Sequence, residues 1–409
     1  MKRTFPLLCA LILQPAVGAQ TTDQPPPSAA DMWRIIQQQQ REIQALRREL
    51  ATVRQTPAPA VEAEAEAEAA APETPVSATH IGGYGELHYN NLDGSGGASD
   101  RKQIDLHRFV LYFGHDFDDR LRFQSELELE HAFAADTADG SAPGEVELEQ
   151  AYVEYDLRDD LSARAGLFLV PVGILNETHE PPTFYGVERN PVEQAIIPST
   201  WWEAGVALTG RWGDGFGYDL ALHSGLDTSA AAGYAVRAGR QNGAKAQADD
   251  PAVTARLRWH GLPGIELAGT LQYQADITQG RDPLAGSATL AEIQGVFQHG
   301  PWGLKALYAR WHLQGSGPAA IGADDQNGFY LEPSYRIGPR LGLFARYNRW
   351  DNQAGSNSGT ARDSTRVQWN LGLDWWLHPD VVLKADYQKQ DNDDGANRDG
   401  INLGIGYQF

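Results

Sequence analysis

Hydrophobic and polar positions alternate with a period of two over residues 79–409. Leu121 and Phe123, for example, alternate with Arg122 and Gln124. In a β-strand every second side chain lies on the same face, so this pattern gives each strand one apolar and one polar face. A strand between lipid and a water-filled lumen needs those two faces. The pattern therefore predicts an all-β fold, a transmembrane antiparallel β-barrel.

About sixteen such segments follow one another, and an even number allows the first and last strands to pair antiparallel and close the barrel. They lie near residues 80–90, 103–117, 120–133, 145–157, 160–170, 201–212, 215–225, 251–260, 263–276, 287–299, 302–314, 326–338, 340–351, 364–377, 380–391 and 399–409. Tight connections alternate with longer polar ones. The tight ones are 117–121, 157–161, 213–216, 260–264, 298–302, 337–341 and 377–381, and the longer ones include 226–250, 277–286, 315–325 and 352–363. Short turns at one end and long loops at the other are typical of outer-membrane barrels.

Residues 1–19 have the pattern of a cleaved secretory signal peptide. Lys2 and Arg3 precede an apolar stretch, and Val17-Gly18-Ala19 supply the small residues of a cleavage site. The apolar stretch is shorter than the about 20 residues that a membrane-spanning helix needs. We therefore expect export and a bacterial outer-membrane location.

Three further segments precede the barrel. Residues 20–30 form a Pro-rich spacer, and residues 31–54 carry apolar side chains at alternating steps of three and four, which predicts a short coiled-coil helix. One apolar stripe on a helix of this length predicts a partner and a homo-oligomer, with a homotrimer expected, although a helix that never pairs remains an alternative. We expect this helix to be periplasmic. Residues 55–78 are an acidic low-complexity linker, expected to be disordered.

Composition excludes several kinds of function. The formal net charge of −21 argues against a nucleic-acid partner, because such binding rests on phosphate neutralisation. Cys9, the single cysteine, lies in the signal peptide, so the mature chain offers no thiol for a disulfide, metal site or nucleophile. We expect neither a cofactor nor a metal.

Alternation also assigns charged side chains to the water-facing wall. The bases are Arg122, Arg164, Arg211, Arg256, Arg258, Arg336, Arg346, Arg366 and Lys384, and the acids are Glu126, Glu128, Glu130, Glu154, Glu203, Asp219, Glu266, Glu332, Asp374 and Asp386. Bases and acids are nearly equal in number, so the strands show no basic excess of the kind that selects anions. Glu126, Glu128 and Glu130, with Glu145, Glu147 and Glu149 on the next strand, favour cations locally or serve as partners for neighbouring arginines.

Tryptophans lie near many strand ends, where amphipathic rings favour the lipid–water boundary. They are Trp201, Trp202, Trp212, Trp259, Trp302, Trp311, Trp350, Trp375 and Trp376. We expect them to form interfacial girdles, with packing in a protein core as the alternative.

Four segments resemble the phosphate-selective porin O and P family: the coiled-coil start, THIGGYGELHYN (79–90), DLHRFVLYFGHDF (105–117) and GLFLVPVGILNETHEPPTFYGVERNPVE (166–193). The terminal NLGIGYQF (402–409) is similar to the signal that the outer-membrane barrel assembly machinery recognises. The resemblance implies a trimeric sixteen-stranded porin with a loop folded into its lumen. The near balance of acids and bases on the strands departs from the basic track of the phosphate-selective members.

The stretch from Pro171 to Pro198 fits that loop, because its prolines and lack of alternation exclude a ladder strand. A connection of this length usually has a function. Its candidates for narrowing the pore are Asn176, Glu177, His179, Glu180, Tyr185, Glu188, Arg189 and Glu193. Packing outside the barrel, as a cap or subunit contact, is the alternative. The spacing of His179 from Glu177 and Glu180 does not favour a metal site.

The interpretation that results is a porin for passive diffusion of small solutes and ions, including anions such as phosphate. A structural or adhesive barrel anchored by the coiled coil is one alternative. A barrel enzyme is the other, but no serine lies in a pattern that pairs it with a histidine for nucleophilic catalysis.

Overall fold

The structure, a computed structural model, describes residues 78–135, 143–355 and 363–409. The signal peptide, the coiled-coil helix and nearly all of the acidic linker expected from the sequence lie outside these residues. Among the described residues no helix combines the length and apolarity that a membrane crossing requires.

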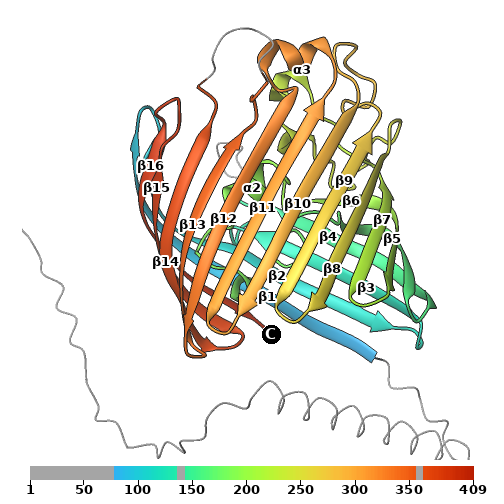
Figure 1. Cartoon of the computed structure of the whole chain (residues 1–409), viewed down its shortest axis with the longest axis horizontal. Helices are drawn as coiled ribbons and strands as arrows, with labels where there is room; N and C mark the ends of the chain where they lie inside the picture. Colours follow the sequence, from blue (N-terminus) through green and yellow to red (C-terminus); the bar gives the residue numbers. More distant parts are fainter. Residues whose placement is uncertain (1–77, 136–142, 356–362) are drawn as a thin grey trace, which may run out of the picture. The chain divides into compact units, whose positions relative to one another are not determined.

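Sixteen strands in the described ranges form a closed barrel in sequence order, each antiparallel to its neighbours (Figure 1). They are β1 (Ala78–Ser95), β2 (Arg101–Asp116), β3 (Leu121–Glu130), β4 (Val146–Arg158), β5 (Leu161–Leu169), β6 (Trp202–Trp212), β7 (Phe216–His223), β8 (Ala252–Leu262), β9 (Ile265–Gln274), β10 (Ala288–His299), β11 (Trp302–Leu313), β12 (Asp325–Ile337), β13 (Leu341–Asp351), β14 (Arg366–His378), β15 (Val381–Gln390) and β16 (Asn397–Gln408). Short helices lie in the loops: η1 (Pro181–Thr183), α2 (Pro191–Ala195), η2 (Ala230–Ala232), η3 (Val236–Gly239) and α3 (Ser316–Ile321).

The expected strands and the alternation of short and long connections are confirmed. Every strand bound agrees within about three residues, except that β1 continues to Ser95. The barrel closes where β1 meets β16: the Gly83 amide donates to the Phe409 carbonyl at 3.0 Å, and the Phe409 amide donates back at 2.9 Å. Closure pairs the backbone groups of every strand, which the interior of a bilayer requires.

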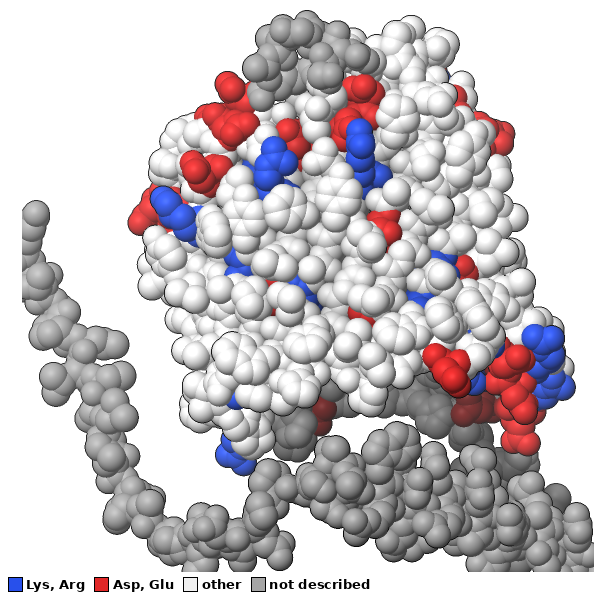
Figure 2. Space-filling view, in the orientation of Figure 1, with Lys and Arg blue, Asp and Glu red and all other residues white. Residues whose placement is uncertain are grey.

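The two faces of the wall have the character that the alternation predicts. Large apolar side chains on the outer face are exposed, among them Ile293 (64 %) and Leu371 (67 %), while polar side chains on the inner face, such as Asn90 and Thr254, are fully buried. On the face shown in Figure 2, most of the wall is neither acidic nor basic, and the larger charged groups lie toward its two ends. Exposed apolar groups outside and buried polar groups inside are the reverse of a water-soluble protein.

Two long connections fold into the barrel and fill part of it. We call residues 170–201, between β5 and β6, the inner loop, and residues 224–251, between β7 and β8, the covering loop. Both contribute to one buried apolar cluster, the inner loop through Val192 and Ile196 and the covering loop through Leu226, Tyr234 and Val236. The position of the inner loop excludes the alternative that it packs outside the barrel.

The expectation of tryptophan girdles is wrong for several residues. Trp212, Trp302 and Trp375 are about half exposed or more and fit a girdle, but Trp201 and Trp311 are completely buried in the lumen cluster. Trp202 and Trp376 are also buried, and Trp350 packs against the same cluster. These rings face inward because the inner loop supplies an apolar surface there, which strand alternation alone does not reveal.

Candidate functional site

The middle of the inner loop is held against the far wall of the barrel. Lys384 on β15 donates from Nζ to the carbonyls of Phe184 and Gly186, both at 2.9 Å. The Val187 amide donates to Asp386 Oδ2 at 2.9 Å. Glycines on the wall make room for the loop: a Cβ at Gly406 would lie 2.2 Å from the Pro181 side chain.

The C-terminal part of the inner loop is organised by α2. Asn190 caps this helix by accepting the Glu193 amide at 2.8 Å. The Glu193 carboxylate accepts from the Leu175 amide at 2.6 Å and from the Tyr330 hydroxyl at 2.9 Å. Burial raises the pKa of Glu193, although these donors act in the opposite direction. Glu193 therefore holds the loop together through these hydrogen bonds, although it also contributes to the lining of the cavity described next.

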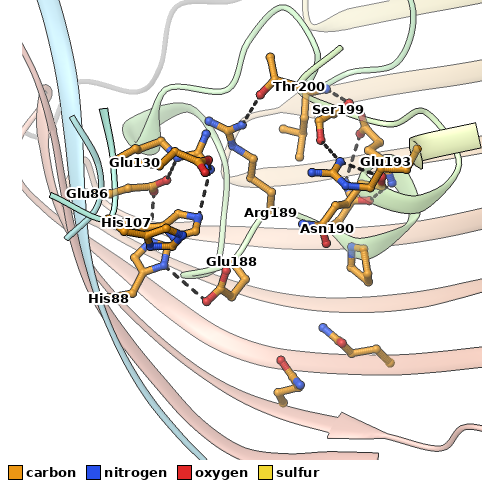
Figure 3. Close-up of a pocket in the computed structure, with 18 of the residues that line it drawn as sticks. Glu86, His88, His107, Glu130, Glu188, Arg189, Asn190, Glu193, Ser199 and Thr200 are labelled. Atoms are coloured by element: carbon orange, nitrogen blue, oxygen red, sulfur yellow. Dashed lines mark hydrogen bonds and ion pairs between the residues drawn. The ribbon is translucent and has the colours of Figure 1, made fainter. Parts of the chain in front are cut away.

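A cavity of about 510 Å³ remains between the inner loop, the covering loop and the wall, where β1–β4, β6 and β13–β16 contribute to its lining. Figure 3 shows Glu86, His88, His107 and Glu130 on one side of this central cavity, and Arg189, Ser199 and Thr200 of the inner loop on the other. Its lining contains residues from both loops and from several strands, which makes it the main candidate for the solute path.

Three arginines on the loop side of the central cavity, Arg189, Arg237 and Arg240, form what we call the arginine trio. Their acceptors are neutral oxygens: Arg189 donates to Thr200 Oγ1 at 2.7 Å, Arg237 to the Ser199 carbonyl at 2.7 Å, and Arg240 to the Thr200 carbonyl. The Nε atoms of Arg189 and Arg240 are buried without a hydrogen-bond acceptor. Burial lowers the pKa of Arg237, and the nearby charge of Arg240 lowers it further. Within the described ranges none of the three guanidinium groups is in direct contact with a carboxylate, so the trio presents positive charge that favours an anionic ligand.

The strand side of the central cavity carries the opposite charge. Glu130, Glu145, Glu147 and Glu149, which we call the acidic wall, come from β3, β4 and the connection between them. Their position opposite the trio places both signs of charge along the same passage. A solute that crosses the cavity therefore passes between a positive and a negative surface.

A histidine cluster beside the acidic wall consists of His88 on β1, His107 on β2 and His131 directly after β3. The rings of His88 and His107 stack with centroids 4.7 Å apart. Asp105 Oδ2 lies 3.2 Å from His107 Nδ1 and 2.8 Å from His131 Nδ1. His88 Nδ1 lies 3.4 Å from the Glu188 carboxylate, so the cluster also contacts the inner loop.

The other polar candidates of the inner loop contact different parts of the wall. Glu177 pairs with Arg256 on β8, and Glu180 accepts from the Tyr112 hydroxyl at 3.4 Å. His179 approaches Glu126 and Glu149. Asn176 is buried and donates to the carbonyls of Val170 and Trp201, so it closes the base of the loop. The Tyr185 ring stacks on Phe344 at 5.4 Å.

The strand residues expected to line the pore are divided among several environments. Arg122 and Arg164 both pair with Glu154, and Arg256 and Arg258 both pair with Asp219. Arg122, Arg211 and Arg258 line a second cavity of about 790 Å³ near the short turns. Arg336 lies over the Trp376 ring at 4.0 Å, and Arg366 pairs with Asp394. Arg346, Glu126 and Glu128 are buried, and Glu130 lines the central cavity.

Sequence reasoning did not identify several lining residues, above all Arg237 and Arg240. It treated residues 226–250 as an ordinary polar loop, whereas the covering loop turns inward. The sequence signal for this inward turn was the presence of the apolar residues Leu226, Tyr234 and Val236 in the loop. In the structure each of them is fully or almost fully buried. Glu86, His88, Arg101, His107, Arg108 and Arg398 also line the central cavity and were not proposed.

Comparisons with known proteins agree with this architecture. A family model described as Gram-negative porin matches residues 58–395. An uncharacterized protein of Aquifex aeolicus (strain VF5) is 33 % identical over 364 residues, which cover 80 % of this chain and 79 % of the relative.

Two solved structures show the same fold at low sequence identity. The outer membrane channel DcaP of Acinetobacter baumannii is 14 % identical, with 81 % of this chain and 97 % of that chain covered and a TM-score of 0.56. The anion-selective porin of Comamonas acidovorans is 15 % identical, with 81 % and 100 % covered and a TM-score of 0.55. The matching family model is the general Gram-negative one, and the narrower resemblance to the phosphate-selective porins stays a prediction.

Proposed function

Because this chain belongs to the Gram-negative porin family and forms an outer-membrane channel for small solutes, we propose that its central cavity discriminates among those solutes by charge. The observation that carries this proposal is the arginine trio, whose three guanidinium groups hydrogen-bond only to neutral oxygens among the described residues. Solutes diffuse passively past the trio, and negatively charged groups are attracted there.

Small oxyanions such as inorganic phosphate fit the trio chemically. Guanidinium groups donate paired N–H bonds to phosphate and carboxylate oxygens, and the three guanidinium groups line the central cavity. The acidic wall opposite limits the advantage of anions and disfavours highly charged ones. We therefore propose a moderate preference for small anions, including phosphate.

The test of this function is the electrical behaviour of the full protein in a planar lipid bilayer. Discrete conductance steps are expected, with a reversal potential in a KCl gradient that indicates preference for chloride. Phosphate added to the bath should reduce the chloride current in a saturable manner, because it occupies the trio. An absence of conductance would favour the structural or adhesive barrel, and a cation preference would contradict the role of the trio.

Family and fold favour a channel over the alternative of a barrel enzyme. Nucleophilic catalysis needs a serine held next to a histidine. Histidines at the central cavity instead contact carboxylates and one another. We propose no catalytic role for them.

The targeting and assembly that the sequence predicts remain part of the proposal. Residues 1–19 would direct export, the terminal segment ending in Phe409 would be recognised by the barrel assembly machinery, and the helix at residues 31–54 would join three copies in the periplasm together with contacts between barrel walls. The lipid of the outer membrane would cover the remaining outer face.

The membrane placement makes a direct prediction for the outer face of β10. Ile293 lies near the middle of the strand and is exposed. Replacing it with arginine (Ile293→Arg) should lower the free energy of unfolding in lipid vesicles by about 2–4 kcal/mol, because the charge would lie near the bilayer midplane. Reversible urea unfolding in vesicles measures this loss.

A matched control is Thr289→Arg on the same face of β10, four residues nearer the long loops. Its expected cost is about 0–1 kcal/mol, since lipid-facing charges are tolerated near the interface. Equal costs at both positions would argue against a bilayer centred on this strand.

A further inference from the structure

The contact between the inner loop and the acidic strands contains a constellation of ligands for a metal ion. His179 Nε2 lies 3.3 Å from Glu126 Oε1 and 3.6 Å from Glu149 Oε2. All three ligand atoms lie within 4.8 Å of one another, and all three side chains are buried. The residues come from the inner loop, β3 and β4, so only the folded barrel brings them together.

The hydrogen bonds around His179 orient its ring for this role. Nδ1 lies 3.1 Å from the Asn176 carbonyl, and because a carbonyl only accepts, Nδ1 carries the proton. In the neutral ring the lone pair is therefore on Nε2, which faces the two carboxylates. Histidine ligands of metals typically donate their other ring nitrogen to a carbonyl or carboxylate in this manner.

The carboxylates are also arranged for a cation. Gln150 donates to Glu126 Oε2 at 2.6 Å, which leaves Oε1 directed toward His179. Glu149 is 2 % exposed, and its Oε2 has no hydrogen-bond donor. A buried carboxylate oxygen without a donor is costly unless a cation or proton compensates it.

A β-bulge explains how Glu149 reaches this position. The register between β3 and β4 shifts between Glu126 and Leu127, where Gln150 pairs with Glu126 and Leu148 pairs with Leu127. Glu149 is the extra residue, so it and Gln150 both approach Glu126. Bulges commonly redirect a side chain at functional sites.

The distances suit Zn²⁺ better than a larger cation. With metal–ligand bonds of about 2.0–2.1 Å, two ligands of a tetrahedral site lie about 3.3–3.4 Å apart. The two distances to His179 Nε2 are close to this separation without rearrangement. One imidazole and two carboxylates are also a ligand set that Zn²⁺ uses, with a water molecule in the fourth position.

The position of this group also allows an ion to reach it. Glu149 lines the central cavity, while Glu126 and His179 line a separate cavity of about 230 Å³ on the other side. The group therefore lies between two spaces in the lumen.

Two other groups in the described ranges have similar spacing but are less suitable. They are His88, His107 and Glu188, and Asp105, His107 and His131. Both contain His107, whose Nε2 lies 3.0 Å from an Arg108 guanidinium nitrogen. That guanidinium only donates, so Nε2 accepts and the proton of the neutral ring is on Nδ1, the atom 3.2 Å from Asp105 Oδ2. Neither ring nitrogen is then free to bind an ion, and Arg108 adds a positive charge next to it.

We propose that Glu126, Glu149 and His179 bind a divalent transition-metal ion such as Zn²⁺, which fastens the inner loop to β3 and β4. The ion would neutralise two buried carboxylates and fix the boundary of the central cavity. The site shares Glu149 with the acidic wall, and Arg189 donates to the His179 carbonyl at 3.2 Å, but no arginine of the trio is a ligand of the ion. Metal binding and charge selectivity are therefore measured separately, and a failure to bind Zn²⁺ would not by itself contradict the proposed channel function.

The experiment measures Zn²⁺ binding to the full protein in detergent after removal of metals with a chelator, by isothermal titration calorimetry. Co²⁺ serves as a second probe, because its visible absorption reports tetrahedral coordination. The variants are His179→Ala, the conservative Glu149→Gln, and two controls. Glu128→Gln removes a neighbouring buried carboxylate, and His107→Gln removes both alternative groups. Circular dichroism confirms that each variant is folded.

We expect one Zn²⁺ per chain in the wild type and in both controls, and affinity at least about tenfold weaker in His179→Ala and Glu149→Gln. Loss of binding in His107→Gln would assign the ion to the histidine cluster and overturn the proposal. Undiminished binding in either site variant, or none in the wild type, would also overturn it.

Discussion

Replacing Arg346 with methionine should lower the free energy of unfolding by about 3–5 kcal/mol, because it removes one partner of a buried ion pair. Arg346 is 1 % exposed and donates to Glu332 Oε2 at 3.1 Å. It also donates to the carbonyls of Tyr185 and Glu188, at 3.2 and 3.1 Å. The substitution leaves the buried Glu332 charge and two loop carbonyls without their donor.

The same substitution should change the channel, since Arg346 joins β13 to the inner loop. With this joint removed, the loop should fluctuate more, and single-channel recordings should show added current noise. Reversible urea unfolding in vesicles measures the stability, and the bilayer recordings measure the noise.

Two further variants test the explanation. Arg366→Met removes a partly exposed pair with Asp394 and should cost only about 0–1 kcal/mol. Adding Glu332→Gln to Arg346→Met should recover part of the loss, because no unpaired carboxylate then remains. If Arg346→Met costs as little as Arg366→Met, Arg346 does not hold the loop.

Neutralising the arginine trio should produce the largest change in ion selectivity. A unit charge about 6 Å from a permeating ion in water contributes about 0.7 kcal/mol, so three charges contribute about 2 kcal/mol. The variant that combines Arg189→Gln, Arg237→Gln and Arg240→Gln should therefore lower the chloride-to-potassium permeability ratio by about tenfold or more. Inhibition of the chloride current by phosphate should disappear at the same time.

Reversal potentials in KCl gradients measure this ratio, and they are best recorded at about 0.1 M salt or below, where screening acts over about 10 Å. Arg310→Gln is the matched control, because Arg310 is exposed on the outer face of β11 and pairs there with Asp325. It removes one positive charge without changing the lumen and should leave the ratio unchanged. A triple variant with the selectivity of the wild type would show that solutes do not pass the trio.

Alternation along the chain was sufficient to predict the wall of the barrel. In β3, for example, the alternation that begins at Leu121 determines which side chains face lipid. Adjacent side chains of a strand point to opposite faces, whatever the position of the strand in the barrel. The short turns between strands were also predicted correctly, because turn residues are a local property of the sequence. The inward position of residues 171–198 was predicted correctly from a family resemblance. Neither prediction requires knowledge of which strands lie across the lumen.

What lies inside the barrel was decided by tertiary structure. His179 was considered next to Glu177 and Glu180, its neighbours in sequence, but it contacts Glu126 and Glu149. The bulge that brings Glu149 there breaks the period of two, and the covering loop adds Arg237 and Arg240 to the lumen. The sequence alone determined the wall and its two faces because a strand imposes one periodicity on all its residues. The pairing of charges within the lumen depends on two loops that fold back across the barrel, and no sequence spacing encodes which distant side chains they meet.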